Sequence, residues 1–508
     1  MILARGGALG VALALLLTAS GHAATIPVPG TTARVEASGY VDGLAVAEIG
    51  GPRQRPQALA ELSLLGKITQ NLRTQLTLRG RAGGPFEGGH PGVMNLVHEF
   101  QNRSPSLEVN EAWAELRLGN AQVRAGIQKF AWGKLDGTPP TDVLTPRDLH
   151  DPLVRDIEES KIGIPAVQLT YYLPPVAALD LSELRASLVY IPIAVPARLA
   201  LVQERWFPPS IASSNLAFTE REAEEIFRGV DFTGPVRVPV NLRTLNARAP
   251  KQLDAGGIAG RLGGTVLQMD WSVSHYTGPE TGPNADLDVS VRCRTCPTAF
   301  PAGRLPAHVR SFLRQEHDII HMTGADASRP FGGATVRAEV AVFQDRPYLR
   351  ISRDLIARAL EPDVLVRYAG RLLGGQRARV PLQPLFPDRD SVEWGIGADY
   401  LIEGFLPLVQ VNQVIFTDDG PDQLLSNPET RILGSVRKRF LQDTLELEVR
   451  GVYAIERGAW FVYPRVAYRA GDHWRLRLGY LAVGGPLTSM IGQFHANDEF
   501  VLEGRYSF

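Results

Sequence analysis

The chain ends with Phe500-Val501-Leu502-Glu503-Gly504-Arg505-Tyr506-Ser507-Phe508, a segment in which two kinds of side chain alternate. Successive side chains of an extended strand point to opposite faces. One face would therefore be apolar or small and the other polar: Phe500, Leu502, Gly504, Tyr506 and Phe508 against Glu503, Arg505 and Ser507. Such a strand fits the wall between an apolar and an aqueous phase, although a soluble edge strand can show the same alternation.

The first residues predict that the chain is exported. Arg5 gives the N-terminal region a positive charge, and the apolar run 8–17 follows it. Gly21-His22-Ala23 then offers small residues at the positions that a signal peptidase reads. We expect a signal peptide over residues 1–23, cleaved after Ala23, and a single mature domain over 24–508. The alternative is a membrane anchor, but a helix needs about 20 apolar residues to span a bilayer.

In an exported protein, a terminal aromatic residue that closes an alternating strand resembles the C-terminal signature of outer-membrane barrels. The resemblance makes Tyr506 and Phe508 candidates for an assembly signal read by the barrel-assembly machinery. It also implies that one face of the strand meets outer-membrane lipid while the other meets water.

The composition limits the remaining choices. The 508 residues include 53 basic and 54 acidic ones, so no positive field invites nucleic acid. Fifty glycines and only two cysteines indicate β-structure with many turns rather than a disulfide-rich scaffold. No later stretch is long and apolar enough for a transmembrane helix.

Alternation recurs along the chain and predicts about 18 strands (16–18), a transmembrane antiparallel β-barrel of the all-β class. We place them near 33–47, 57–69, 71–82, 107–118, 121–131, 162–173, 184–192, 253–262, 265–277, 316–327, 333–345, 391–402, 405–417, 430–440, 444–455, 459–470, 473–484 and 498–508.

The connections between these strands alternate in length. We expect short turns at Gln70, Gly119-Asn120, Gly263-Gly264, Pro330, Gln442-Asp443 and Gly471-Asp472. Long connections include 83–106, 132–161, 193–252, 278–315, 346–390 and 485–497. Outer-membrane barrels combine short periplasmic turns with longer extracellular loops, and a barrel of this size encloses an aqueous lumen unless a loop or plug fills it.

Several stretches resemble poorly characterised porin-like outer-membrane families near the alginate-export channels. They are Trp132–Asp136 with Asp142–Leu149, Lys161–Ala166, Val189–Pro192 and Met269–Gly278. The resemblance implies a large barrel with a transport role and names no substrate.

The stretch from Trp132 to Leu149 leaves the top of a strand and cannot continue as a helix through Pro139-Pro140. Its charged residues are candidates for a loop that folds inward and narrows the pore, with a solvated loop as the alternative: Lys134, Asp136, Arg147 and Asp148. We expect Trp132 itself in the aromatic belt at the membrane interface.

Alternation also sends charged residues into the lumen. The predicted pore-lining set is Arg73, Arg79, Arg124, Glu446, Glu448, Arg450, Arg475, Arg477, Glu503 and Arg505. Fixed charges of opposite sign would create a field that selects solutes. The alternative is that these charged residues pair with one another across strands and stabilise only the barrel wall.

Two motifs in the loops have competing interpretations. Thr219–Phe227 predicts a short capped helix, either an acidic surface helix or a pore plug. Cys293 and Cys296 are disulfide candidates in an oxidising compartment. A zinc site with His317 and His321 is the alternative, but residues four apart in a strand lie about 13 Å from each other and cannot share an ion.

No nucleophile elbow, zinc-protease helix or phosphate loop occurs in the sequence. We therefore expect no enzyme, no cofactor and no metal. The sequence predicts an outer-membrane channel for passive or substrate-selective diffusion of a small solute, whose identity it does not reveal. A structural or adhesive surface barrel plugged by its own loops is the second hypothesis.

Overall fold

The computed structural model describes residues 24–29, 31–49, 54–83, 106–200, 205–209, 215–218, 236–244, 256–282, 284–293, 307–349, 378–380, 386–418 and 424–508. The predicted signal segment lies outside these residues. No helix in the described part of the chain is long and apolar enough to cross a membrane.

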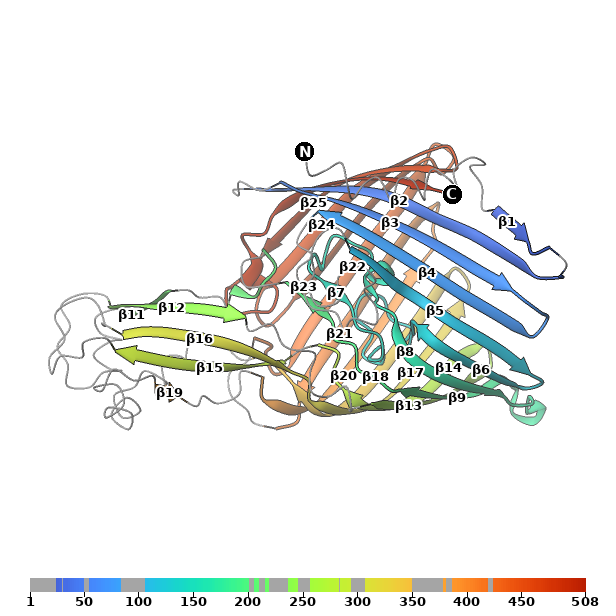
Figure 1. The fold of residues 1–508 in the computed structure, drawn as a ribbon, viewed down its shortest axis with the longest axis horizontal. Helices are drawn as coiled ribbons and strands as arrows, with labels where there is room; N and C mark the ends of the chain where they lie inside the picture. Colours follow the sequence, from blue (N-terminus) through green and yellow to red (C-terminus); the bar gives the residue numbers. More distant parts are fainter. Residues whose placement is uncertain are drawn as a thin grey trace.

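Eighteen strands form one closed antiparallel barrel, as the alternation predicted (Figure 1). They are β2 (Arg34–Glu48), β3 (Gln54–Lys67), β4 (Leu72–Gly83), β5 (Ser106–Leu118), β6 (Ala121–Gln128), β8 (Ile164–Tyr172), β9 (Leu181–Ile191), β13 (Gly257–Val266), β14 (Met269–Pro279), β17 (Ile319–Phe331), β18 (Ala334–Pro347), β20 (Asp388–Tyr400), β21 (Phe405–Phe416), β22 (Glu429–Phe440), β23 (Leu445–Ala454), β24 (Ala459–Ala470), β25 (Trp474–Gly484) and β26 (Glu499–Ser507).

Closure of the barrel depends on the first and last strands of the wall. β26 pairs antiparallel with β2 from Tyr40↔Ser507 to Glu48↔Glu499. Beyond that ladder the backbone of Phe508 exchanges two hydrogen bonds with Gly39, at 2.9 and 3.0 Å. The short strand β1 (Ala24–Pro27) then pairs with the beginning of β2 along the same edge.

The two ends of the barrel differ. Consecutive strands are joined at alternate ends of the barrel. At one end, here called the short-turn end, the longest connection is 173–180, and all the longer connections lie at the other end, the long-loop end. Three of the long connections contribute to a second sheet with the strand order β11 (Asn215–Phe218), β12 (Val236–Thr244), β16 (Ala307–Glu316), β15 (Asn284–Cys293) and β19 (Ala378–Val380). This sheet projects beyond the barrel at the left of Figure 1.

Two expected turns are displaced. The turn between β13 and β14 is at Leu267-Gln268, and Gly263-Gly264 lies within β13, where pairing with β9 shifts register. Leu267 and Gln268 adopt positive φ angles of 49° and 63°, as a tight hairpin requires. Likewise, Pro330 is inside β17, and the turn follows at Gly332-Gly333.

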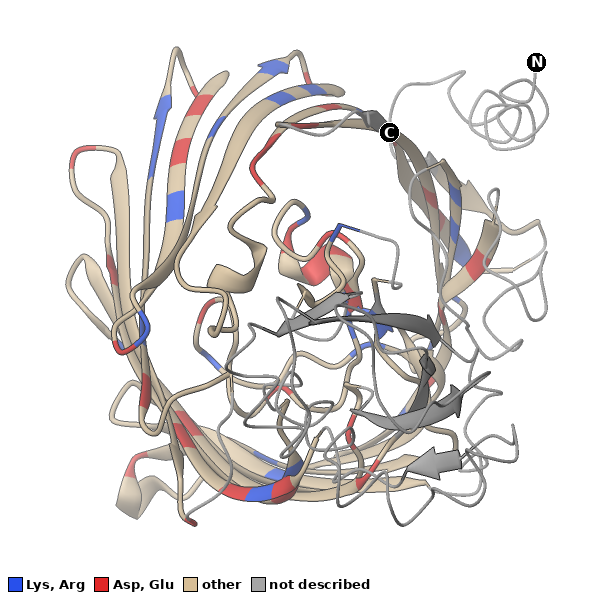
Figure 2. Cartoon of the chain, turned by 90° about the vertical axis from the view of Figure 1, so that its left-hand side faces the viewer, with Lys and Arg blue, Asp and Glu red and all other residues tan. Residues whose placement is uncertain are grey.

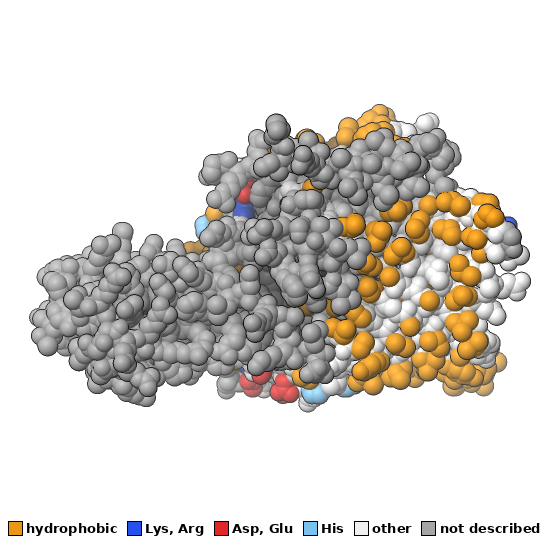
Figure 3. Space-filling model, in the orientation of Figure 1, with side chains coloured by type: hydrophobic (Ala, Val, Ile, Leu, Met, Phe, Trp, Pro, Cys, Tyr) orange, Lys and Arg blue, Asp and Glu red, His pale blue; other side chains and the backbone are white. Residues whose placement is uncertain are grey.

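The outward face of the wall is apolar (Figure 3). Exposed aromatic residues flank the short turns: Tyr171, Phe331, Tyr400, Phe405, Phe440 and Trp474. Others lie near the long-loop end: Tyr190, Tyr453, Trp460 and Phe500. Aliphatic residues such as Val409, Leu478 and Leu502 fill the band between them. Each of these three side chains is more than half exposed in the isolated chain, which is the exposure expected of a surface covered by lipid.

Candidate constriction in the barrel lumen

The connection between β6 and β8, residues 129–163, runs inside the barrel and is here called the inner loop. Figure 2 looks into the barrel from the long-loop end and shows segments of the chain lying within the ring of strands. Gly133 and Gly137 take φ angles of 91° and 79°, which a side chain would strain, so they let the loop reverse direction inside the wall.

One side of the inner loop is held by Glu339 on β18. Its carboxylate accepts hydrogen bonds from the backbone N–H groups of Lys134 and Leu135 and, at 3.0 Å, from the hydroxyl of Thr141. Gln410 on β21 adds a reciprocal pair with the backbone of Asp136, at 2.9 and 3.0 Å. These contacts fix the loop against strands more than 190 residues away in sequence.

The same side of the loop packs on an apolar inner wall. Phe130, Trp132 and Leu144 belong to one buried cluster with inward-facing side chains of the wall: Ala166, Val189, Ile191, Ala259, Tyr276, Ile320, Met322, Ala341 and Phe343. Trp132 is only 7% exposed and lies under the guanidinium of Arg261, 5.3 Å from the ring centroid. Our placement of Trp132 in the interfacial aromatic belt was wrong, because the loop that carries it turns inward instead of outward.

The opposite side of the loop is acidic and meets arginines of the wall. Asp156 precedes the short helix α2 (Ile157–Ser160), and its carboxylate lies 2.9 Å from Arg465, 3.5 Å from Arg477 and 3.7 Å from Arg450. Burial disfavours its charge, but the attraction of Arg465 and Arg477 outweighs burial and lowers the pKa of Asp156 to about 2. Asp156 is therefore ionised at neutral pH and bridges the loop to β23, β24 and β25.

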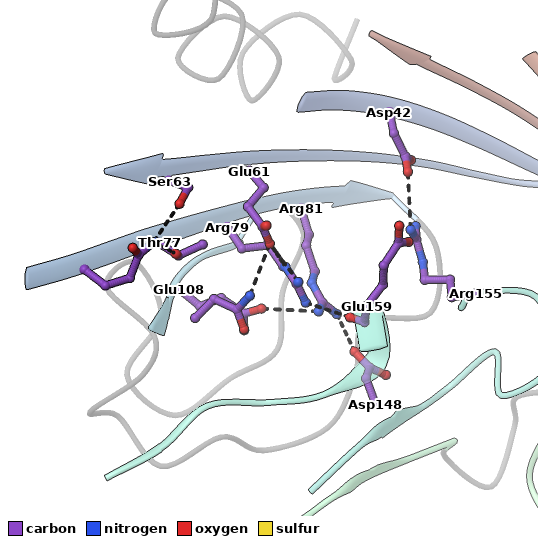
Figure 4. A network of polar contacts seen from close by, with 12 residues as sticks. Asp42, Glu61, Ser63, Thr77, Arg79, Arg81, Glu108, Asp148, Arg155 and Glu159 are labelled. Carbon is purple, nitrogen blue, oxygen red and sulfur yellow. Dashed lines mark hydrogen bonds and ion pairs between the residues drawn. The ribbon is translucent and has the colours of Figure 1, made fainter. Parts of the chain in front are cut away.

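A second group of contacts joins α2 to β26, β2 and β4. Arg505 donates to Glu159 at 2.6 Å and to Asp42 at 2.8 Å. Arg79 donates to the backbone carbonyl of Glu159 at 3.1 Å while its Nε donates to Glu61 at 2.8 Å. Figure 4 shows Glu61 of β3 and Arg79 of β4 beside each other, with Glu159 of the inner loop close to them.

A third group surrounds β7 (Asp148–Leu149), a strand of the inner loop that pairs with β10 (Arg198–Leu199). Arg198 pairs with Asp148 at 3.1 Å, and Arg81 of β4 pairs with the same carboxylate and, at 3.3 Å, with Glu108. Burial disfavours ionisation of Asp148, but the neighbouring Arg81 and His150 outweigh it and hold its pKa well below the usual range.

Most of the predicted pore-lining residues are paired with a side chain of opposite charge. Arg475 and Arg477 both contact Glu503, Glu448 pairs with Arg465 at 2.6 Å, and Glu446 with Arg439 at 2.8 Å. Arg124 pairs with Glu115 and stacks on Trp113. Arg450 donates to the carbonyl of Leu153 at 2.6 Å. Arg73 is exposed near the short-turn end, opposite Lys67 and Glu115.

The loop candidates occupy different places. Arg147 and Lys161 both pair with Asp142, at 3.1 and 3.2 Å, so they hold the loop together internally. Asp148 is in the third group above. Lys134 and Asp136 lie nearer the β14 and β18 wall, 4.0 Å from Asp270 and 3.7 Å from Arg337 respectively.

Sequence reasoning missed several members of the constriction. The largest omissions are Asp42, Glu61, Arg81, Asp156, Glu159, Glu339 and Arg465. Arg81 continues the alternation of Arg79 and was recognisable from it. Asp156 and Glu159 had no periodic signal, because their role depends on a loop that crosses the barrel.

The remaining motifs are only partly described. Cys293 ends β15 and Cys296 lies outside the described residues, so the disulfide and zinc alternatives both stay predictions. His317 contacts the carbonyl of Glu280 at 2.8 Å, whereas His321 is bonded to Thr277 at 2.9 Å. The predicted helix at 219–227 is outside the described residues.

Among known proteins, several solved structures resemble this chain in overall fold. No family model matches the chain, and no curated protein matches it. The implied proximity to alginate-export channels therefore stays a prediction. OccK8 (OprE) of Pseudomonas aeruginosa is 8% identical with a TM-score of 0.48, over 93% of this chain and 98% of that one.

Two further structures are similar to a comparable degree. OccAB1 of Acinetobacter baumannii is 10% identical with a TM-score of 0.47, over 96% of this chain and 98% of its own. A loop-deletion variant of OmpT, an outer membrane protein of Vibrio cholerae, is 8% identical with a TM-score of 0.38, over 94% and 99%.

Proposed function

We propose that this chain is a bacterial outer-membrane channel through which small solutes diffuse past the inner loop. The observation that carries the proposal is a closed wall of strands whose outward face is apolar and whose inward face carries charged side chains beside the apolar part that packs on the inner loop. Such a barrel separates a lipid phase from a polar interior. The short-turn end would face the periplasm and the long-loop end the exterior.

The exposed aromatic residues at both ends support this location. Amphipathic rings concentrate at the two membrane–water interfaces of outer-membrane barrels. Here they cluster beside the short turns, as at Phe331 and Trp474, and again near the long-loop end, as at Tyr190 and Phe500. A soluble protein would leave this apolar surface exposed to water, which disfavours that alternative.

The inner loop would set which solutes pass. It is fixed to the wall on two sides, by Glu339 and Gln410 on one and by three arginines around Asp156 on the other. Fixed charges of both signs on the wall and the loop would then act on a passing solute, which would meet an ordered electrostatic field rather than a featureless tube.

Planar-bilayer recording tests the proposal. Purified full-length protein should give discrete, ohmic current steps in 1 M salt. Deleting residues 134–159 should enlarge the steps while the protein keeps the heat-modifiable migration of a folded barrel. An absence of current steps in both proteins would overturn the channel and favour the plugged structural or adhesive barrel.

A further inference from the structure

The outward face of the wall is hollowed between β21 and β26. This groove has a volume of about 450 Å³, within the range of about 300–1,000 Å³ typical of ligand pockets. Its lining is mainly apolar and includes Val436, Leu447, Val449, Pro464, Val466 and Leu478. The groove therefore lies on the surface that the proposed membrane location would present to lipid.

The local sequence explains part of the hollow. Gly434 and Gly451 face each other directly across β22 and β23, next to the Val436↔Val449 pair. Neither glycine has a side chain that could cover the wall beside the groove. Pro464 has no N–H group to donate, and the β24–β25 ladder is interrupted at Tyr463 and Pro464 before it resumes at Arg465.

One end of the groove carries a cation. Lys438 lies on the outward face, opposite Phe405 and Leu447 on the neighbouring strands. Its ammonium is 3.7 Å from the ring centroid of Phe405 and 5.3 Å from that of Phe440. Lys438 is two residues from the end of β22, so its side chain can reach the membrane interface while its stem covers apolar surface.

No carboxylate of the described residues pairs with Lys438. By contrast, Lys67 on the inward face of the barrel is 2.5 Å from Glu36. A cation near the strand end of an apolar, lipid-facing wall lies at the depth of the lipid headgroups, where a phosphate can neutralise it. A negatively charged group could therefore bind at the ammonium of Lys438, next to the two aromatic rings and the groove.

We propose that the groove binds one phospholipid of the leaflet at the short-turn end, with an acyl chain in the hollow and the phosphate on Lys438. The proposal depends on the membrane location proposed above but not on conduction. A second copy of the chain is disfavoured as the occupant. The outward positions of β21 to β26 contain no Asp or Glu, so a copy meeting this face symmetrically would bring no anion to Lys438.

Native mass spectrometry of the detergent-purified full chain tests the site, with palmitoyl-oleoyl phosphatidylglycerol as the probe. The wild type should retain one lipid, and Lys438→Gln should weaken its retention at least tenfold, whereas Lys438→Arg should keep it. Val466→Trp should fill the groove and remove the adduct without changing charge. Lys67→Gln is the matched control and should bind as the wild type does, while diacylglycerol, which lacks the phosphate, should not bind.

Equal retention by the wild type, Lys438→Gln and Val466→Trp would overturn the site. A dimeric mass that Val466→Trp abolishes would overturn it in favour of a second copy. Heat-modifiable migration of each variant shows that the barrel is folded. Failure of conduction in bilayers with lipid adducts intact would contradict the channel alone, so the two proposals fail separately.

Discussion

The carboxylate of Asp156 lies 2.9 Å from Nη1 of Arg465, and this contact joins the inner loop to the wall at β24. Arg465 also contacts Glu448 at 2.6 Å, so the guanidinium is shared between a fixed partner on the next strand and a partner on the loop. The wall would keep its own ion pair if the loop moved away. The inner loop, in contrast, would lose the ion pair between Arg465 and Asp156, the residue that precedes α2.

Asp156→Asn should loosen the inner loop without unfolding the barrel. The side chain is 37% exposed, so its loss should cost less than the roughly 3–5 kcal/mol of a fully buried ion pair. Single-channel currents should become noisier and larger on average. Glu158→Gln is the matched control, because this side chain is 73% exposed and, among the residues that the structure describes, pairs only with Lys161. Identical traces for both variants would contradict the anchoring role of Asp156.

Acidification should reproduce that effect in the wild type. The pKa of Asp156 is about 2 in the folded protein, below its ordinary value of about 3.9. A carboxyl group with a lowered pKa contributes stability that is complete above the ordinary value and is lost as the pH falls through the folded value. Channel noise should therefore rise between about pH 4 and pH 2. In Asp156→Asn that increase should be absent.

Phe508 should matter for assembly, because it completes the closure of the barrel. Its backbone exchanges hydrogen bonds with Gly39, and a Cβ added at Gly39 would lie 2.7 Å from the Phe508 ring and 2.3 Å from the carbonyl of Glu61. Deleting Phe508, or the change Gly39→Val, should lower the amount of heat-modifiable barrel in the outer membrane several-fold. Ser507→Ala should not. Normal levels of the Phe508 deletion would remove its assembly role.

The two ends of the barrel should be distinguishable on intact cells. An epitope inserted at Pro283, in the connection between β14 and β17, should be stained by antibody from outside. An epitope between Leu267 and Gln268, or at Gln442, should be stained only after the outer membrane is opened. The reverse pattern would invert the proposed orientation.

The strands were predictable because their signal is local. In β26 the four apolar or small residues Phe500, Leu502, Gly504 and Tyr506 alternate with a mainly charged and polar face, and neighbours in sequence suffice to assign the two faces. The turn at Leu267-Gln268 was not predictable from the sequence, because neither residue favours a positive φ angle. The glycine pair Gly263-Gly264, which suggests a turn, lies instead at an irregularity inside β13.

The constriction was predictable only in part. Alternation puts Arg79, Arg477 and Arg505 on the polar face of their strands, and all three contact the inner loop, but their loop partners Asp156 and Glu159 come from a segment without periodicity. The apolar inner wall around Ile320 and Met322 was also missed, because the assumption of a polar lumen does not hold where the inner loop packs against the strands.

The last prediction concerns Arg475 and Arg477, whose guanidinium groups both contact Glu503. Replacing both with glutamine removes two positive charges and leaves Glu503 with Arg505, at 3.6 Å. If these charges act on passing ions, their field extends over a Debye length of about 10 Å at 0.1 M salt. The reversal potential in a tenfold salt gradient should then move toward cation preference, most clearly at low salt.

Two further variants serve as controls for this measurement. Glu503→Gln removes the opposite charge from the same group and should move the reversal potential toward anion preference. Arg73→Gln, exposed near the short-turn end, should change it less. The competing hypothesis is that the three side chains only satisfy one another within the wall. It predicts a lower melting temperature for the double variant with reversal potentials equal to the wild type, and that result would remove the electrostatic basis for selectivity at this position.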